Sequence, residues 1–460
     1  MAGIGFRLQK LLREDTYTGL LKGYLYSAVI SSGPMLSSII CIGLLGVLSL
    51  PVLNTEDYLL FRTTIVYIFA FSLIFTGFFQ MATTRYLADR LYSREPHALI
   101  PCCIGLMMIT IVCQSIIGVI VFYQVIPDWQ YVVLATSLYI IISCLWNIMM
   151  FISATRNYTL ITVGFFLGSV ISLVVGQTMG LKFGLFGYLF GFTLGQLTIV
   201  VFLMASFFKE YDFFHVINFK FMRYFRKYPD LCVAGIVINI AIWVDKMMFW
   251  FSPYGERIVG FFHSFPPYDG AFFIAYLSIV PALSLFLVRI ETSFSHKYRY
   301  FYQNIMGKSP LKNIETAKDR IIEDLKDSIQ VLLKVQGFIT ILFISGAVTI
   351  MKMAKLSWLQ IVMFKIGTLS AFLLILFQFL LIIMFYFELR REAMVLTIVF
   401  FVTNIVATGI TISMGIRSFG YGFFAATFAS LFIGYFLLNY KLTHLEYLTF
   451  TFQPIQKVSD

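Results

Sequence analysis

Long apolar runs divide the chain into segments that can cross a lipid bilayer. A helical span needs about 20 mostly apolar residues to cross a hydrocarbon core about 30 Å thick. The runs predict helices over residues 24–50, 59–80, 99–123, 130–153, 158–179, 183–207, 229–251, 270–291, 329–350, 362–387, 391–414 and 419–439. We therefore predict an all-α polytopic membrane protein with about twelve transmembrane helices.

Polar segments between these runs set the predicted domain organisation. Residues 208–228 hold five Lys and Arg and form a basic cytoplasmic linker between two six-helix bundles, 24–207 and 229–439. Residues 1–23 mix charged and apolar positions, which is typical of an amphipathic segment on the inner face and not of a signal peptide. Residues 440–460 are predicted to be a cytoplasmic tail.

A second long polar segment, residues 292–328, is predicted to hold an amphipathic helix. Apolar residues recur there at helical spacing beside charged ones, at Ile314, Ile321, Leu325 and Ile329. Two interpretations are open: a solvated helix that leads into the ninth span, or a docking surface for a cytoplasmic partner.

The basic residues predict the orientation in the membrane. With the N-terminus inside, cytoplasmic segments hold 24 of the 34 Lys and Arg and the outer loops hold five. Cytoplasmic loops of membrane proteins carry such an excess. We therefore expect both termini in the cytoplasm.

The two halves resemble copies of each other at an offset of 235 residues. Residues 178–182 (TMGLK) correspond to 413–417 (SMGIR), and the same offset aligns Arg156 with Arg391, Phe165 and Phe166 with Phe400 and Phe401, and Gly187 with Gly422. Small residues then recur every fourth position in both copies: Gly187, Gly191 and Gly195, and Gly422, Ala426, Ser430 and Gly434. Such stripes let helix backbones approach closely in lipid.

An even number of helices in each copy predicts parallel repeats around an axis along the membrane normal. Transporters that rock two bundles about a central site use such repeats. We expect two six-helix halves around a central cavity. The repeat by itself does not prove transport.

Composition narrows the function classes. Only 12% of the residues are charged and 59% are hydrophobic, so the net charge of +11 is better explained by cytoplasmic loops than by nucleic-acid binding. The six cysteines form no C-x-x-C pair, and neither a disulfide nor a zinc site is expected.

Asp245 is the acidic residue that lies well inside a predicted span, and Lys246 follows it. Charges at membrane depth are costly, at about 2.5–3.5 kcal/mol on insertion scales, and mark substrate or ion paths. Adjacent helical residues point about 100° apart, so we expect partners besides each other. A substrate path is one interpretation; the other is that neighbouring helices hold each charge, or that Lys246 snorkels outward.

Polar and aromatic residues lie near this pair on the same helix. Asn239 supplies an amide and Trp243 and Trp250 supply indole faces, a combination that suits a sugar ring. Trp250 is equally typical of an interfacial anchor. We predict a substrate path lined by Asp245, Lys246, Asn239 and Trp243.

Charged residues also gather at the predicted cytoplasmic ends of spans, at Arg289, Glu291, Glu388 and Arg391. Two interpretations are open: ordinary salt bridges within loops, or an inner gate that opens and closes. Gly33, Pro34 and Pro281 interrupt predicted helices and indicate either static kinks or hinges.

Motifs for catalysis are missing. Residues 307–309 (GKS) resemble the end of a phosphate-binding loop, but position 302 is Tyr where that motif requires Gly. All five histidines fall in predicted loops, and no H-E-x-x-H motif or suitable carboxylate pair occurs. We predict a protein without enzymatic activity, metal or cofactor.

Several motifs together resemble a known family. Residues 1–6 (MAGIGF), 31–34 (SSGP), 243–246 (WVDK), 275–281 (AYLSIVP) and 288–292 (VRIET) are similar to the G component of the bacterial Pel exopolysaccharide system. The resemblance extends from residue 1 through the final helix.

That family lies within the multidrug, oligosaccharidyl-lipid and polysaccharide exporter superfamily. The resemblance implies a V-shaped protein of two bundles in the bacterial inner membrane. It also implies export of a hexosamine-rich polymer with a cytoplasmic glycosyltransferase and other membrane subunits, one of which senses cyclic di-GMP. It transfers no established functional residues to this chain.

Other functions stay open. A lipid-linked oligosaccharide flippase or a drug exporter is of the same mechanical class, although residues 24–50 lack the acid that some drug exporters place in their first helix. A non-transporting scaffold that anchors the glycosyltransferase through residues 208–228 and 292–328 is the alternative of a different class.

Overall fold

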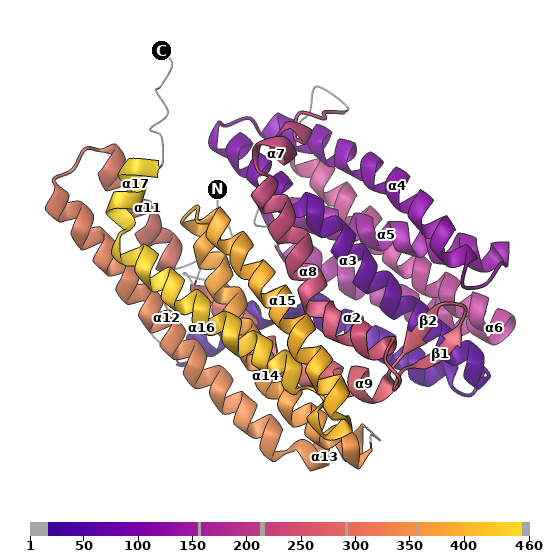
Figure 1. The fold of residues 1–460 in the computed structure, drawn as a ribbon. Coiled ribbons are helices and arrows are strands. Elements are labelled where there is room, and N and C mark those ends of the chain that lie inside the picture. Colours follow the sequence, from indigo (N-terminus) through magenta and orange to yellow (C-terminus); the bar gives the residue numbers. More distant parts are fainter. Residues whose placement is uncertain (1–16, 155–157, 212–216, 290–292, 355–356, 453–460) are drawn as a thin grey trace. The chain divides into compact units, whose positions relative to one another are not determined.

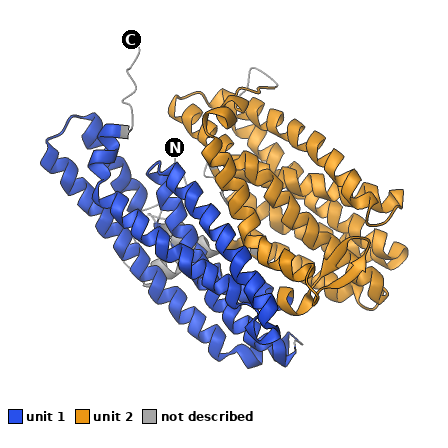
Figure 2. Ribbon diagram, in the orientation of Figure 1, with its two compact units in different colours: residues 1–28, 270–460 blue, residues 29–269 orange. Residues whose placement is uncertain are grey.

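The computed structural model describes residues 17–154, 158–211, 217–289, 293–354 and 357–452. The amphipathic segment predicted in residues 1–23 lies largely outside these ranges, as do Arg156 and Glu291. The chain forms two compact units, and each is described by itself (Figure 2). The first unit comprises residues 29–269, and the second comprises residues 1–28 and 270–460.

The first unit is a bundle of long helices (Figure 1). In chain order they are α2 (Tyr17–Ser49, of which residues 29–49 belong here), α3 (Thr55–Tyr92), the 3-10 turn η1 (Pro96–Ala98), α4 (Leu99–Tyr123), α5 (Trp129–Ala154), α6 (Tyr158–Glu210), α7 (Met222–Lys227) and α8 (Pro229–Trp250). Helices α3, α4, α5, α6 and α8 pack side by side. These contacts bury only part of each apolar span, 44% in α3 and 33% in α4, as expected for helices whose other sides face lipid.

Helix α6 is a hairpin of two antiparallel legs. Gly184 has φ 56° and ψ −132°, a backbone conformation that glycine adopts without strain, and it interrupts the helix. A Cβ on Gly191 would lie 2.2 Å from the backbone N of Gly176, and one on Gly187 would lie 2.1 Å from the carbonyl O of Met179. The predicted glycine stripe therefore lies where the two legs touch.

A short β-hairpin follows α8. Strands β1 (Glu256–Val259) and β2 (Phe262–Ser264) pair antiparallel. Gly260 has φ 59°, and a Cβ there would lie 2.7 Å from the carbonyl O of Gln124, so the hairpin packs against the end of α4. The apolar pattern did not predict these strands, because short strands leave little signal in an aromatic-rich loop.

The second unit is also helical. Its elements are α9 (Pro266–Tyr276, from residue 270 on), η2 (Leu277–Ile279), α10 (Val280–Arg289), α11 (Ser295–Met306), α12 (Leu311–Ser345), α13 (Ala347–Met353), α14 (Trp358–Tyr386), α15 (Arg390–Met414), η4 (Ile416–Ser418), α16 (Tyr421–Thr443) and α17 (Leu445–Phe452). Helices α14, α15 and α16 pack together, and α12 packs against α10, α11 and α14.

The predicted span count is confirmed. Ten helices of the described residues are long and apolar enough to cross a membrane. One of them, α6, contains two antiparallel legs, and the broken helix α9–η2–α10 covers the predicted eighth span. The protein is thus an all-α polytopic membrane protein with about twelve spans.

The units do not divide at the predicted linker. Helix α8 packs along α3, so residues 229–269 join the first unit. A Cβ on Gly235 would lie 2.2 Å from the carbonyl O of Gly77, so the two helix backbones approach closely. The division into halves by the internal repeat stays a prediction.

The two copies of the repeat lie one in each unit. The α6 hairpin belongs to the first unit, and α15 with α16 to the second. A Cβ on Gly422 would lie 2.7 Å from the Cα of Thr408, so the second stripe also lies between two helix backbones. The turns differ, because the second copy uses two left-handed glycines, Gly415 and Gly420, around η4.

Candidate functional site

The charged pair near the end of α8 is buried in the first unit. Asp245 is 0% exposed and Lys246 is 7% exposed. The Lys246 Nζ lies 3.2 Å from each carboxylate oxygen of Asp245 and donates to the carbonyl O of Ile242, also at 3.2 Å. The two charges thus neutralise each other inside the helix bundle, in spite of the 100° between their directions, because the long lysine side chain bends back.

Aromatic residues complete this cluster. The Tyr268 hydroxyl donates to Asp245 Oδ2 at 2.8 Å, and the Trp250 Nε1 donates to Asp269 Oδ2 at 2.9 Å. Tyr67 stacks on the Trp250 ring at 4.7 Å between centroids. We call Asp245, Lys246, Tyr268, Trp250 and Asp269 the α8 cluster.

Trp250 does not face lipid. It is 1% exposed, and its ring stacks on Tyr67. The burial of the ring therefore excludes the interpretation of Trp250 as an anchor at the membrane interface. Trp243 is half-buried, with its ring 6.3 Å from that of Trp250.

Asn239 joins α8 to α3. Its Nδ2 donates to the carbonyl O of Gly235 at 3.0 Å and to the carbonyl O of Leu73 at 3.3 Å. These bonds lie at the close approach of Gly77 and Gly235. The predicted path residues thus all lie on α8. Asn239, however, bonds to Leu73 of α3 and not to a residue of the α8 cluster.

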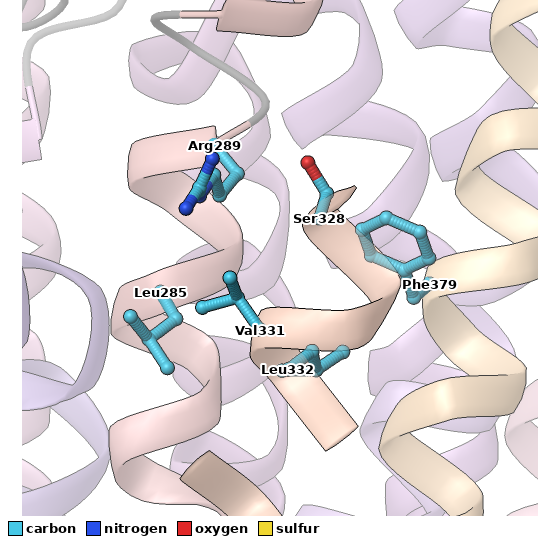
Figure 3. Close-up of a pocket in the computed structure, with 6 residues that line it drawn as sticks. All are labelled: Leu285, Arg289, Ser328, Val331, Leu332 and Phe379. Carbon is cyan, nitrogen blue, oxygen red and sulfur yellow. The ribbon is translucent and has the colours of Figure 1, made fainter. Parts of the chain in front are cut away.

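Three of the four predicted gate residues, Arg289, Glu388 and Arg391, are described and belong to the second unit. Glu291 lies outside the described residues. Arg289 ends α10 and lines a small cavity with Leu285, Ser328, Val331, Leu332 and Phe379 (Figure 3). Glu388 has φ 59° and lies 3.5 Å from Arg390, whereas Arg391 is exposed. The neighbouring Glu392 pairs with Lys441 at 2.5 Å.

The predicted hinges differ from each other. Pro34 lies inside the continuous helix α2, and a Cβ on Gly33 would lie 2.9 Å from Thr162 Cγ2. Near Pro281 the helix is interrupted by η2, since proline has no N–H to donate and clashes with the preceding turn. Whether either position is a hinge stays a prediction.

Sequence reasoning missed two sets of residues. Tyr268 and Asp269 follow the β-hairpin and were not associated with Asp245. Four polar residues of α12 (Asp324, Ser328, Gln336 and Thr340) are at most 4% exposed. Their spacing by multiples of four residues along a partly apolar helix was the available signal.

The chemistry of the α8 cluster suits the binding of a polar ligand. Within the described ranges, no three His, Cys, Asp or Glu residues gather as metal ligands. The α8 cluster instead offers hydrogen-bonding groups, two buried carboxylates and flat aromatic faces.

The fold matches solved membrane transporters. A multidrug resistance MATE family transporter of the MOP superfamily, in an outward-facing conformation, is similar with a TM-score of 0.65 and 14% identity, over 93% of this chain and 97% of the other. A MOP superfamily transporter from Pyrococcus furiosus gives 0.62 and 14% identity, over 92% and 96%. The inward-facing MATE transporter gives 0.58 and 14%, over 91% and 99%. The fold is therefore that of a MATE-like transporter.

A family model identifies the chain more closely. Residues 1–450 match the model of the PelG family, described as a proposed exopolysaccharide exporter (EPS-E). The chain belongs to the PelG family. The protein is a membrane transporter. A comparison with curated proteins finds no significant sequence match.

Proposed function

We propose that this protein exports a hexosamine-rich, Pel-type exopolysaccharide across the bacterial inner membrane. Its membership of an exopolysaccharide exporter family over residues 1–450, together with a MATE-like fold, is the observation that carries the proposal. It acts as one subunit of a synthase and export complex and has no catalytic activity of its own.

Transport would proceed by alternating access or by a gated path between two bundles around a central cavity. Parallel repeats of this kind occur in transporters that rock two bundles about a site. One copy of the repeat in each unit supports the proposal. Arg289, Glu291, Glu388 and Arg391 would form the inner gate, and Gly33, Pro34 and Pro281 the hinges.

The substrate path would include Asp245, Lys246, Asn239 and Trp243. The half-buried Trp243 supports this role, because an indole face can lie against the C–H side of a sugar ring. The internal neutralisation of the Asp245–Lys246 pair also suits a neutral or mixed-charge polymer, since neither charge is left to trap it.

The partners would be a cytoplasmic glycosyltransferase and other Pel-type membrane subunits, including a cyclic di-GMP sensor. Helix α11, the first half of α12 and α17 support a docking surface for the glycosyltransferase. Lys318 of α12 pairs with Glu446 of α17 at 2.5 Å, and Lys297 of α11 pairs with Asp324 of α12 at 2.8 Å, so the three helices are fastened together.

Gene deletion tests the proposal. Cells that carry the synthase but lack this protein should retain radiolabelled polymer in the cytoplasm and secrete none. Secretion at the level of the parent strain would overturn the proposal. A purified protein that moves a drug or a lipid-linked oligosaccharide by itself in proteoliposomes would favour those substrates instead.

A second experiment separates transport from scaffolding. Lys312→Glu combined with Arg320→Glu reverses the charge at two exposed positions of α12, and loss of glycosyltransferase co-purification alone would support the docking surface. If secretion survives neutralisation of both Asp245 and Lys246 but fails with this reversal, the scaffold explains the phenotype.

A further inference from the structure

A short segment that leads into α8 lies across one end of the first unit (Figure 1). The backbone N of Asn218 donates to the carbonyl O of Pro101, near the start of α4, at 3.0 Å. The Tyr224 hydroxyl donates to Asp89 Oδ2, near the end of α3, at 2.8 Å. Helix α8 begins directly after the segment. Residues 217–228, which we call the α7 segment, therefore lie at the level where three spans end, which is the membrane surface.

One side of the α7 segment is packed into the unit. Phe221 is 0% exposed, and the Phe225 ring lies 5.7 Å from that of Phe79 of α3 between centroids. A Cβ on Gly105 of α4 would lie 2.8 Å from the carbonyl O of Asn218, so no side chain fits between α4 and the segment. These contacts determine which side chains of the segment point outward.

The outward side combines large apolar and basic side chains. Ile217, Phe219 and Met222 are 41%, 45% and 47% exposed. Segments at membrane interfaces combine these two kinds of residue, because apolar side chains enter the acyl region while cations stay among the headgroups. The exposed cations of the α7 segment are Lys220, Arg223, Arg226 and Lys227.

The two acids nearest the end of α3 do not neutralise these four cations. Asp89 pairs with Arg85 at 3.3 Å, and Glu95 pairs with Arg90 at 2.5 Å. Asp230, at the start of α8, offsets at most one of the four. Within the part of the chain that the structure describes, none of the four lies in an ion pair. The segment thus presents an excess of positive charge.

We propose that the α7 segment lies in the headgroup layer and binds anionic phospholipid of the bilayer. Its cations contact the lipid phosphates, and Phe219 and Met222 enter the acyl region. The predicted orientation places this end of the first unit at the cytoplasmic leaflet, where each Lys or Arg near an anionic surface raises the affinity about fivefold. The inference goes beyond polymer export and holds for any transported substrate.

An acidic protein could also bind a basic surface, but two observations favour lipid. The segment lies at the ends of spans, where headgroups surround it, and its exposed apolar side chains alternate with its cations between residues 217 and 223. Because the segment is bonded to α3 and α4 and continues into α8, bound lipid holds the ends of these helices at the membrane surface.

Lipid retention by the purified full-length protein tests the proposal. Native mass spectrometry in neutral detergent compares dioleoyl phosphatidylglycerol with dioleoyl phosphatidylcholine, two lipids that share acyl chains and differ in charge. The parent protein should retain more of the anionic lipid. Combining Lys220→Gln, Arg223→Gln and Arg226→Gln should lower this preference at least about fivefold. An unchanged preference would overturn the proposal.

A matched control separates the α7 segment from net charge. Combining Lys308→Gln, Lys312→Gln and Arg320→Gln removes three exposed cations from the second unit and should leave the preference unchanged. An equal loss in both triple variants would show that net charge alone attracts the lipid, which would overturn the site. Arg223→Lys with Arg226→Lys keeps the charges and should keep the preference, and its loss there would trace the effect to altered structure and contradict the proposal.

Two further outcomes would assign the segment to another ligand. Glycerol 1-phosphate has the phosphate of the lipid without its acyl chains, so it should not displace phosphatidylglycerol. Displacement would replace the lipid by a soluble phosphate. A triple variant of the α7 segment that keeps its lipid preference but no longer co-purifies with the glycosyltransferase would assign the segment to a protein partner.

Spin labels measure the depth of the segment directly. After the six native cysteines are replaced, Met222→Cys carries a nitroxide in vesicles of the same two lipids. Oxygen, which dissolves in acyl chains, should relax this label more than a water-soluble nickel chelate does. Lys308→Cys, in the exposed turn between α11 and α12, should show the opposite order. Equal nickel access at both positions would overturn the proposal. Neither measurement follows export, so failure here leaves the proposed transport function to its own test.

Discussion

At the scale of single residues, the α8 cluster shows how a membrane protein keeps two charges away from water. Lys246 contacts both carboxylate oxygens of Asp245, and Tyr268 supplies a further hydrogen bond. Removal of one charge from a buried pair leaves the other uncompensated. The pair is therefore sensitive to single substitutions and tolerant of joint ones.

Asp245→Asn should lower the stability of the purified protein by about 3 kcal/mol, because the buried Lys246 then loses the carboxylate whose two oxygens it contacts. The thermal midpoint in detergent measures this loss. Adding Lys246→Met should restore most of the stability. A double variant that is stable but exports no polymer supports the substrate path, whereas normal export by that variant would assign the pair a purely structural role.

Tyr268→Phe should cost about 1.5–3 kcal/mol, since it removes one hydrogen bond to a charged group and leaves the ring in place. The same thermal assay applies. Tyr300→Phe is the matched control, because that side chain is 48% exposed. Equal midpoints for both variants would show that the Tyr268 hydroxyl contributes little.

Residue patterns predicted part of this cluster. Asp245 and Lys246 were recognisable because charges within an apolar run are rare. Their partner Tyr268 was not, because it follows a β-hairpin that brings position 268 back to position 245. The sequence shows that a charge lies within an apolar run, where burial is costly. It does not show how the following loop folds to bring a hydrogen-bond partner to that charge.

At the scale of elements, close backbone contact determines where glycine is required. The legs of α6 approach so closely at Gly191 that no side chain fits, whereas Gly43 of α2 has open space around its Cα. The two positions are both helical and differ in their surroundings. They form a natural comparison.

Gly191→Ala should destabilise the protein by about 1–3 kcal/mol, because the new methyl group would lie 2.2 Å from a backbone nitrogen and the legs must separate. Gly43→Ala should be neutral or slightly stabilising, since alanine favours helix by about 1 kcal/mol. Thermal midpoints of the two variants in the same detergent measure the contrast. Similar midpoints would show that the legs of α6 separate freely.

Element boundaries were predictable where apolar runs are long. The stripes of small residues predicted helix contacts in both copies of the repeat, and both lie at such contacts. The break of the eighth span into α9, η2 and α10 was only partly predictable. Pro281 indicated an interruption, but the extent of η2 depends on contacts with α12 that are distant in sequence.

At the scale of the whole molecule, the charge asymmetry makes a topological prediction. Cysteine introduced at Lys308, between α11 and α12, should react with an impermeant thiol reagent only from the cytoplasm. Cysteine at Glu256, in β1, should react only from the opposite side. Both positions are exposed, so access is limited by the membrane and not by burial. Labelling of both from one side would contradict the orientation.

The fold class and span number followed from the sequence because hydrocarbon forces every span to satisfy its own backbone groups. The predicted division into two six-helix halves stays a prediction, and the compact units are grouped differently. Sequence order suggested a division at residues 208–228, yet α8 packs with α3. Side-chain partners, such as the bond from Asn239 of α8 to Leu73 of α3, decide which bundle a helix joins.

Helix α12 has a mechanical consequence. It contains 35 residues, so it is about 52 Å long against a hydrocarbon core of about 30 Å, and it is one continuous helix. If α12 spans the membrane, its charged first half therefore extends beyond the hydrocarbon core. A small tilt of its apolar half becomes a much larger displacement at Leu311, so the glycosyltransferase that we propose to dock there would move with that tilt.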